Sequence, residues 1–72
     1  MNILIGDRLG EKFPSFVKGG KGKYLDTYKV VGFEDKTFGR FVKTIRERNG
    51  DEVGIAIELL QDDVFYEKLK IN

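Results

Sequence analysis

The stretch FGRFVKTIRERNGDEVGIAIELL, residues 38–60, decides between a helical and a strand-rich fold. Its first half places apolar side chains at i, i+3, i+4 and i+7, the spacing of an amphipathic helix: Phe38, Phe41, Val42 and Ile45. Thr37 could cap the start of such a helix, and Asn49-Gly50 could end it. The same Asn-Gly pair is also a strong signal for the turn of a β-hairpin.

The register of the competing hairpin favours strands. A three-residue turn at Arg48–Gly50, with Gly50 in the left-handed conformation, gives one mostly apolar face and one face with opposite charges. Its expected pairs are Ile45–Val53, Phe41–Ile57, Arg40–Glu58 and Arg46–Glu52. A two-residue turn would exchange the faces and oppose Glu47 to Glu52. A helix would carry Gly39 in its interior, at a cost of about 1 kcal/mol relative to alanine. We therefore predict the hairpin.

The rest of the chain also indicates short strands separated by turns. We expect strands at Asn2–Ile5, at Tyr24–Phe33 and at Leu69–Ile71, with a turn at Glu34–Lys36. Residues 64–68 fit a short helix or a strand, and this choice stays open. The predicted fold class is mainly β, a small antiparallel barrel or curled sheet of about five strands with at most one short helix. With 72 residues, we expect a single domain over 1–72.

The strand spacing resembles that of SH3-like small barrels, including the KOW-type modules of transcription and translation proteins. The resemblance consists of an opening Ile5–Leu9, a long irregular loop, a strand at Tyr28–Phe33, the Asn49-Gly50 hairpin and a final Leu69–Ile71. It concerns the fold and identifies no single family. It implies an SH3-like strand order.

Composition excludes many classes of enzyme. The chain contains neither cysteine nor histidine, which rules out disulfides, Cys/His zinc sites, a thiol nucleophile and an imidazole base. Ser15, the only serine, has no obvious base beside it. We expect a protein that is not an enzyme and that binds no cofactor or metal. The apolar run Ile3–Ile5 is too short for a signal peptide or membrane span, so we expect a cytoplasmic protein without membrane contact.

Charge is unevenly distributed along the chain, although the net charge is only +1. Residues 18–48 hold nine basic and four acidic side chains, whereas residues 49–67 hold six acidic and no basic ones. The most basic short segment, Lys18-Gly19-Gly20-Lys21-Gly22-Lys23, lacks the first glycine and the hydroxyl of a nucleotide-binding P-loop. Lysines on a glycine-rich loop can follow a phosphate backbone, and a neighbouring tyrosine can stack on a base. The candidate nucleic-acid-binding residues are Lys18, Lys21, Lys23, Tyr24, Arg46 and Arg48.

Two observations support a different partner. Such a loop is often merely solvated, and a pI near 7.9 is below that of a dedicated nucleic-acid binder. Most of the nine aromatic residues are expected in the core, and the others could form a binding patch, because tyrosine and phenylalanine supply a large contact area at interfaces. The alternative is therefore a protein–protein adaptor or inhibitor, of the kind found in phages and mobile elements, docking on a host protein. Exposed edge strands could also form a homodimer.

Overall fold

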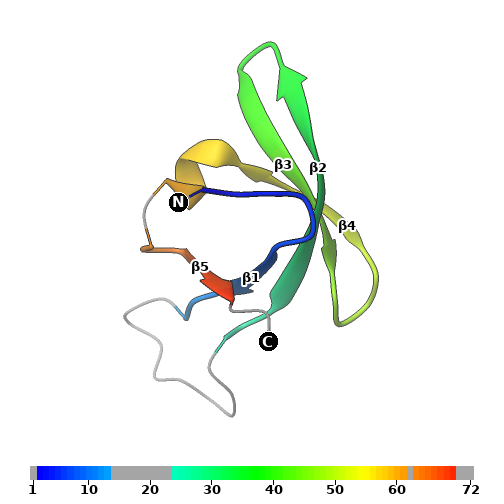
Figure 1. The fold of residues 1–72 in the computed structure, drawn as a ribbon, viewed down its shortest axis with the longest axis vertical. Helices are drawn as coiled ribbons and strands as arrows, with labels where there is room; N and C mark the ends of the chain where they lie inside the picture. Colours follow the sequence, from blue (N-terminus) through cyan, green and yellow to red (C-terminus); the bar gives the residue numbers. More distant parts are fainter. Residues whose placement is uncertain (1, 14–23, 62, 70–72) are drawn as a thin grey trace.

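Five antiparallel strands form one sheet in the computed structural model, which describes residues 2–13, 24–61 and 63–69. The elements are β1 (Arg8–Glu11), β2 (Thr27–Lys36), β3 (Gly39–Arg46), β4 (Glu52–Ala56), the 3-10 turn η1 (Ile57–Leu60) and β5 (Tyr66–Leu69). The strand order is β4-β3-β2-β1-β5, and the strands bend around a shared interior (Figure 1). The mainly β prediction is confirmed in its curled-sheet form. The sheet is not closed into a barrel, and η1 is the only helical element among the described residues.

The predicted hairpin is confirmed, but its register is wrong by one residue. The turn contains four residues, from Glu47 to Gly50, because the N–H of Arg46 donates to the carbonyl of Asp51 at 2.8 Å. The N–H of Gly50 returns to the carbonyl of Arg46, also at 2.8 Å, and Gly50 has the expected left-handed φ of 76°. The side chain of Asn49 accepts from the N–H of Asp51 at 3.0 Å and holds the turn.

This shift changes which face of the hairpin is buried. Val42 pairs with Ile55, and both side chains face the core. Thr44 lies next to them, fully buried, because its hydroxyl donates to the carbonyl of Val53 at 2.7 Å and leaves no unpaired polar group. The expected inward face, with Phe41 and Ile45, points to the opposite side of the sheet.

The strand boundaries differ from expectation at two further places. Residues 2–5 form no strand, because the chain turns at Ile5-Gly6 with a φ of 98° at Gly6. The N–H of Gly6 donates to the carbonyl of Val30, and strand pairing starts only at Arg8. Residues 34–36 form no turn either, since β2 continues to Lys36.

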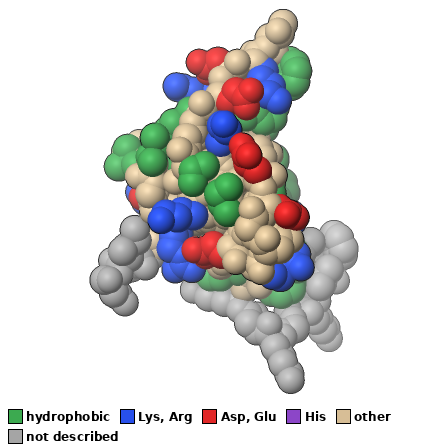
Figure 2. Space-filling view, turned by 90° about the vertical axis from the view of Figure 1, so that its right-hand side faces the viewer, with side chains coloured by type: hydrophobic (Ala, Val, Ile, Leu, Met, Phe, Trp, Pro, Cys, Tyr) green, Lys and Arg blue, Asp and Glu red, His purple; other side chains and the backbone are tan. Residues whose placement is uncertain are grey.

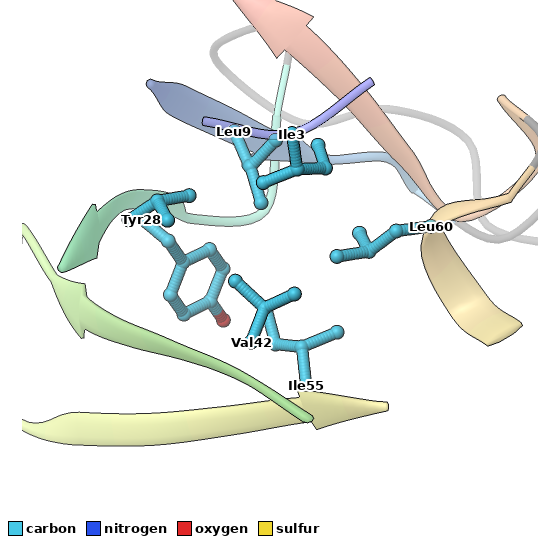
Figure 3. Packing of buried hydrophobic residues seen from close by; sticks show 7 residues of the cluster. Ile3, Leu9, Tyr28, Val42, Ile55 and Leu60 are labelled. Carbon is cyan, nitrogen blue, oxygen red and sulfur yellow. The ribbon is translucent and has the colours of Figure 1, made fainter. Parts of the chain in front are cut away.

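Seven buried side chains form the apolar core (Figure 3): Ile3, Leu9, Tyr28, Val30, Val42, Ile55 and Leu60. They come from the N-terminal segment, β1, β2, β3, β4 and η1, and they point toward one another between these elements. Leu60 on η1 is 1 % exposed and covers the side of the core opposite Tyr28. The 3-10 turn therefore contributes directly to the core.

The β2–β3 hairpin extends beyond this core. The strand pairing shifts by one residue between Val30 and Gly32, which marks a β-bulge at Val31. Beyond the bulge, β4 still pairs with β3 as far as Phe41, and Val42 remains part of the core. Only past Phe41 and its partner Glu34 do the two strands continue alone, as a two-stranded arm that projects from the rest of the sheet (Figure 1).

Candidate nucleic-acid interface

The described candidate residues gather at one end of the sheet. Beyond the β1–β2 ladder, the N–H of Glu11 donates to the carbonyl of Asp26 and the N–H of Leu25 donates to the carbonyl of Glu11, both at 2.8 Å. The chain therefore enters and leaves segment 14–23 beside Asp26. Arg46, Arg48 and Tyr24 all lie near this point. Lys18, Lys21 and Lys23 lie outside the described residues.

Tyr24 is half-buried against the outer face of β1. A Cβ placed on Gly10 would come within 2.6 Å of the Tyr24 ring, so only glycine leaves room for this packing. The Tyr24 hydroxyl donates to Glu67 Oε2 on β5 at 2.9 Å. One side of the ring and the hydroxyl group are thus already engaged within the protein, which leaves a smaller surface for base stacking than the sequence suggested.

Arg46 and Arg48 both interact with the Asp26 carboxylate. Arg48 makes a bidentate contact, with Nε 3.1 Å and Nη2 3.2 Å from the two carboxylate oxygens. Arg46 Nε lies 3.7 Å from Asp26, and Arg46 Nη1 lies 3.5 Å from Asp51. Hydrogen bonding to Arg48, together with the charges of both arginines, lowers the pKa of Asp26 against the opposing effect of its partial desolvation.

A tyrosine pair continues this network towards the core. The Arg46 guanidinium lies 5.8 Å from the centre of the Tyr28 ring, and the Tyr28 hydroxyl donates to Glu11 Oε1 at 2.8 Å. Tyr66 meets Tyr28 edge to face at 6.1 Å. Burial, and secondarily the charge of Glu11, raises the pKa of Tyr66 to about 12, and burial also raises the pKa of Tyr28. Both phenols are therefore neutral over the physiological pH range.

The described part of the site has no excess of positive charge, because the Glu11 and Glu67 carboxylates bonded to Tyr28 and Tyr24 add to those that face the arginines. Two arginines, Arg46 and Arg48, face two carboxylates, Asp26 and Asp51. The sequence predicted that Arg46 would be neutralised, but by Glu52, which instead pairs with Lys43 at 3.5 Å. The role of Asp26 was not predicted, because Asp26 and the two arginines come together only when β1, β2 and the β3–β4 turn are assembled. Of these groups Arg48 is the most accessible cation, with a side chain 66 % exposed.

The expected pair of Arg40 with Glu58 is likewise replaced. Arg40 Nε lies 3.2 Å from Asp35, its partner across the β2–β3 ladder. Arg40 and Arg46 lie at opposite ends of β3, so the bases of residues 40–48 do not form one basic patch. A positive surface at the candidate site would thus depend on the lysines of segment 14–23.

The chain has no match among known proteins, and its described residues form neither a metal site nor a membrane-spanning helix. No family model, curated protein or solved structure matches the chain. Within the described ranges, no cluster of three or more acidic side chains is arranged to hold a metal ion. The described segments also contain no helix that is long and apolar enough to cross a membrane.

Proposed function

We propose that this chain is a small non-catalytic binding module with an SH3-like sheet, and that it contacts nucleic acid through the lysine-glycine segment. The main support is that Arg46 and Arg48 share the Asp26 carboxylate close to the point where the described chain resumes after segment 14–23, and that Tyr24 is the first residue described after this segment. Tyr24 itself packs on Gly10, at the same end of the sheet. Lys18, Lys21 and Lys23 supply the phosphate contacts in this proposal, and Arg48 adds a weaker one.

The strand arrangement supports the SH3-like part of the proposal. A long connection joins β1 to β2, two hairpins link β2, β3 and β4, and β5 returns beside β1. We take this arrangement as support for the SH3-like interpretation. In such a module the sheet supplies a rigid support, and the binding groups are carried on the connections between strands.

The charge balance at the site indicates modest, sequence-independent affinity. A phosphate can bind Arg48 only in competition with the Asp26 carboxylate, because both are ligands for the same guanidinium fork. Most of the affinity must then come from release of counterions by the lysines. Discrimination between bases requires contacts to base edges, and the proposed contacts are to phosphates.

Binding of a fluorescently labelled single-stranded oligonucleotide at several salt concentrations tests this proposal. Three phosphate contacts predict an affinity that falls by about 20-fold between roughly 50 and 200 mM salt. The triple variant K18A/K21A/K23A should lose most of the low-salt affinity and most of this salt dependence. The matched control K29A/K36A/K43A removes the same charge elsewhere and should retain a salt slope close to that of the wild type.

Two outcomes would contradict the proposal. One is the absence of binding at the lowest salt concentration, and the other is an equal loss of affinity in both triple variants. Equal loss would show that only net charge matters. Circular dichroism of both variants provides the check that the sheet is intact.

A second candidate function is docking on a protein, and it is supported by the pairing of charges on the described surface. The described arginines are all in ion pairs, with Glu47, Asp35, Asp26 and Asp51 as partners. A surface of balanced charge has little long-range attraction for a polyanion. The edge strands β4 and β5 could add a strand from a partner or from a second copy. Sedimentation equilibrium tests the second copy, because a homodimer doubles the 8.3 kDa mass.

A further inference from the structure

The projecting arm of the β2–β3 hairpin carries aromatic side chains on both of its faces, with Phe33 on the side of Val42 and Phe41 on the other side. We call it the aromatic arm, and it consists of Phe33, Phe38, Phe41, Lys36 and Arg40. Phe38 and Phe41 meet edge to face, with ring centres 5.6 Å apart. Lys36 Nζ lies 5.3 Å from the centre of the Phe41 ring, and the Arg40 guanidinium lies 5.4 Å from the centre of the Phe33 ring. The two cations thus lie against the rings of the two strands.

The three phenylalanines differ in how much of each side chain is buried by the rest of the fold. Phe41 is half-buried on the outer face of the sheet, and Phe33 is 37 % exposed beneath Arg40. Phe38, in the two-residue turn between the strands, is 79 % exposed, the highest value among the large apolar side chains of the described residues. Its ring contact with Phe41 is an interaction worth about 1 kcal/mol, which does not require so large an exposed apolar surface.

The arm presents this ring in a fixed position. Gly39 follows Phe38 with a φ of 152°, in a region that side chains rarely adopt, which allows the sharp return into β3. Ladder pairs continue up to the turn, with Lys36 opposite Gly39 and Asp35 opposite Arg40. The cations packed on the rings reinforce the arm. An aromatic side chain has only two rotatable bonds, so it loses little conformational entropy when it binds, as is typical of interface residues that contribute strongly to affinity.

Charge indicates the class of partner. The arm carries two acidic residues, Glu34 and Asp35, and two basic residues, Lys36 and Arg40, and the Glu58 carboxylate lies close to Gly39, so this region has no excess of positive charge. The face drawn in Figure 2 shows both signs interspersed on the projecting part, with apolar side chains beside them. Phosphate backbones and anionic membranes are attracted by an excess of positive charge, which this arm lacks. A protein surface, with an apolar pocket and a rim of both charges, is the complementary partner.

We propose that the aromatic arm is a protein-docking element in which the Phe38 side chain inserts into an apolar pocket of a partner protein. Lys36 and Glu34, which lie on the same face of the arm as Phe41, contact the charged rim of that pocket. This site is independent of the proposed nucleic-acid contact, because the arm and the Arg46–Arg48 end lie at opposite ends of β3. A chain with both sites would tether a protein to a nucleic acid.

Position-specific photocrosslinking, followed by affinity measurement, tests the docking site. The photoreactive residue p-benzoylphenylalanine replaces Phe38 in one sample and Phe65, an aromatic residue that is 53 % exposed elsewhere on the surface, in a matched control. Both proteins are irradiated in cells that produce the chain. The expected result is one protein adduct that forms from position 38 and not from position 65.

The crosslinked protein is then purified, and its binding to the full chain is measured by calorimetry. We expect Phe38→Ala to raise the Kd about 30-fold or more, the size of effect that defines a hot-spot residue. Phe65→Ala should change the Kd by less than about threefold, the limit set by small contributions outside the hot spot. Phe38→Trp, which keeps a large ring, should retain more affinity than Phe38→Ala. An unchanged circular dichroism spectrum for each variant shows that the sheet is folded.

Each of four other results would overturn the proposal. Equal adducts from both positions would show non-specific contact by exposed aromatic rings. A nuclease-sensitive adduct would assign the arm to nucleic acid, and an adduct with a second copy of this chain would assign it to self-association. Absence of any adduct from position 38, with the control reagent active, would show that the arm has no partner under those conditions.

Discussion

The two halves of the β2–β3 hairpin have the same secondary structure and opposite environments. On one side of the Val31 bulge, Tyr28, Val30 and Thr44 are at most 3 % exposed, because β1, β4 and η1 enclose them. On the other side, Val42 is still buried beside Ile55 of β4, but at the tip, where no third strand pairs with the hairpin, Phe38 is 79 % exposed. Both halves are rich in aromatic and β-branched residues. Burial is therefore determined by which elements pack against a strand, and strand propensity alone does not distinguish the two halves.

The ion pairs around the core and on the arm also differ. Around the core, several join residues that are distant in the sequence, such as Arg8 with Glu47 at 2.7 Å and Lys68 with Asp7 at 3.1 Å, beside local pairs such as Arg46 with Asp51. On the arm, Arg40 pairs with Asp35, five residues before it, and both side chains are more than half exposed. Pairs between distant segments report on the assembled fold, whereas the local pair requires only the hairpin. Substitutions and changes of pH should therefore lower the free energy of unfolding more when they act near the core than when they act on the arm.

Truncation of a central core residue should have the largest effect. Leu9 on β1 is completely buried, and Leu9→Ala removes its contacts and leaves a cavity. We expect a loss of about 3 kcal/mol in the free energy of unfolding, a large share of what so small a domain possesses. Urea denaturation followed by circular dichroism measures it. A loss below about 1 kcal/mol would mean that this half packs as loosely as the arm.

The contact between Gly10 and Tyr24 should show the next largest effect. In Gly10→Ala the new methyl group would overlap the Tyr24 ring, and we expect a loss of about 1–3 kcal/mol as the ring is displaced. Gly54→Ala is the matched control, because its Cβ would have its nearest neighbour at 4.0 Å. In the double variant Gly10→Ala/Tyr24→Ala, the clash is absent. Its loss in the free energy of unfolding should therefore be smaller than the sum of the losses of the two single variants. Strict additivity would contradict the described packing.

Acidification should lower the free energy of unfolding mainly through the carboxylates near the core, and little through those of the arm. Hydrogen bonding lowers the pKa of Asp7, of Asp26 and of Glu47, chiefly from the Leu4 N–H, Arg48 and Arg8 respectively. The unfolded chain therefore takes up protons first as the pH falls. Stability should be constant above about pH 5 and should decrease as the pH falls through the lowered values of the folded state.

Urea midpoints measured across this range test the acid effect. Asp26→Asn should lower stability at neutral pH and flatten the acid limb of the curve. Asp35→Asn, which removes only the exposed local pair with Arg40, should leave the curve close to that of the wild type. An equal effect of the two substitutions would remove the distinction between the halves.

The smallest change in stability should come from Phe38→Ala. Its side chain is exposed and touches only the arm, so we expect the free energy of unfolding to change by less than about 1 kcal/mol. The same urea experiment measures it. A loss comparable to that of Leu9→Ala would show that the arm is part of the folding core, and the docking role would no longer be needed to explain the exposed ring.

The sequence was sufficient to predict the strand-rich fold, the β3–β4 hairpin and the left-handed Gly50, because these depend on local patterns. It was insufficient for the register. The predicted register placed Phe41 and Ile45 on the inward face. The buried face instead contains Thr44, whose hydroxyl donates a hydrogen bond to the carbonyl of Val53 across the ladder. A threonine at such a position is not distinguishable from an exposed one by pattern alone.

The candidate site was predictable only in part. Tyr24, Arg46 and Arg48 were predicted, and the structure brings them to one end of the sheet. The shared carboxylate of Asp26 was missed, since it lies 20 residues or more from both arginines and is brought to them by strand pairing. The exposed Phe38 was also missed as a contact residue, because its spacing from Phe41 and Val42 fits a buried face equally well.

The position of β5 has a consequence for the order of folding. Among the described strands, β5 pairs only with β1, and its partner residues are about 55–61 positions away in the sequence. The β2–β3–β4 meander forms from short-range contacts, whereas the β1–β5 pair must close most of the chain. During synthesis from the N-terminus, β1 keeps an unpaired edge until residues 66–69 have emerged. We therefore expect β5 to pair late in folding, and a nascent chain stalled before residues 66–69 to expose an edge open to aggregation.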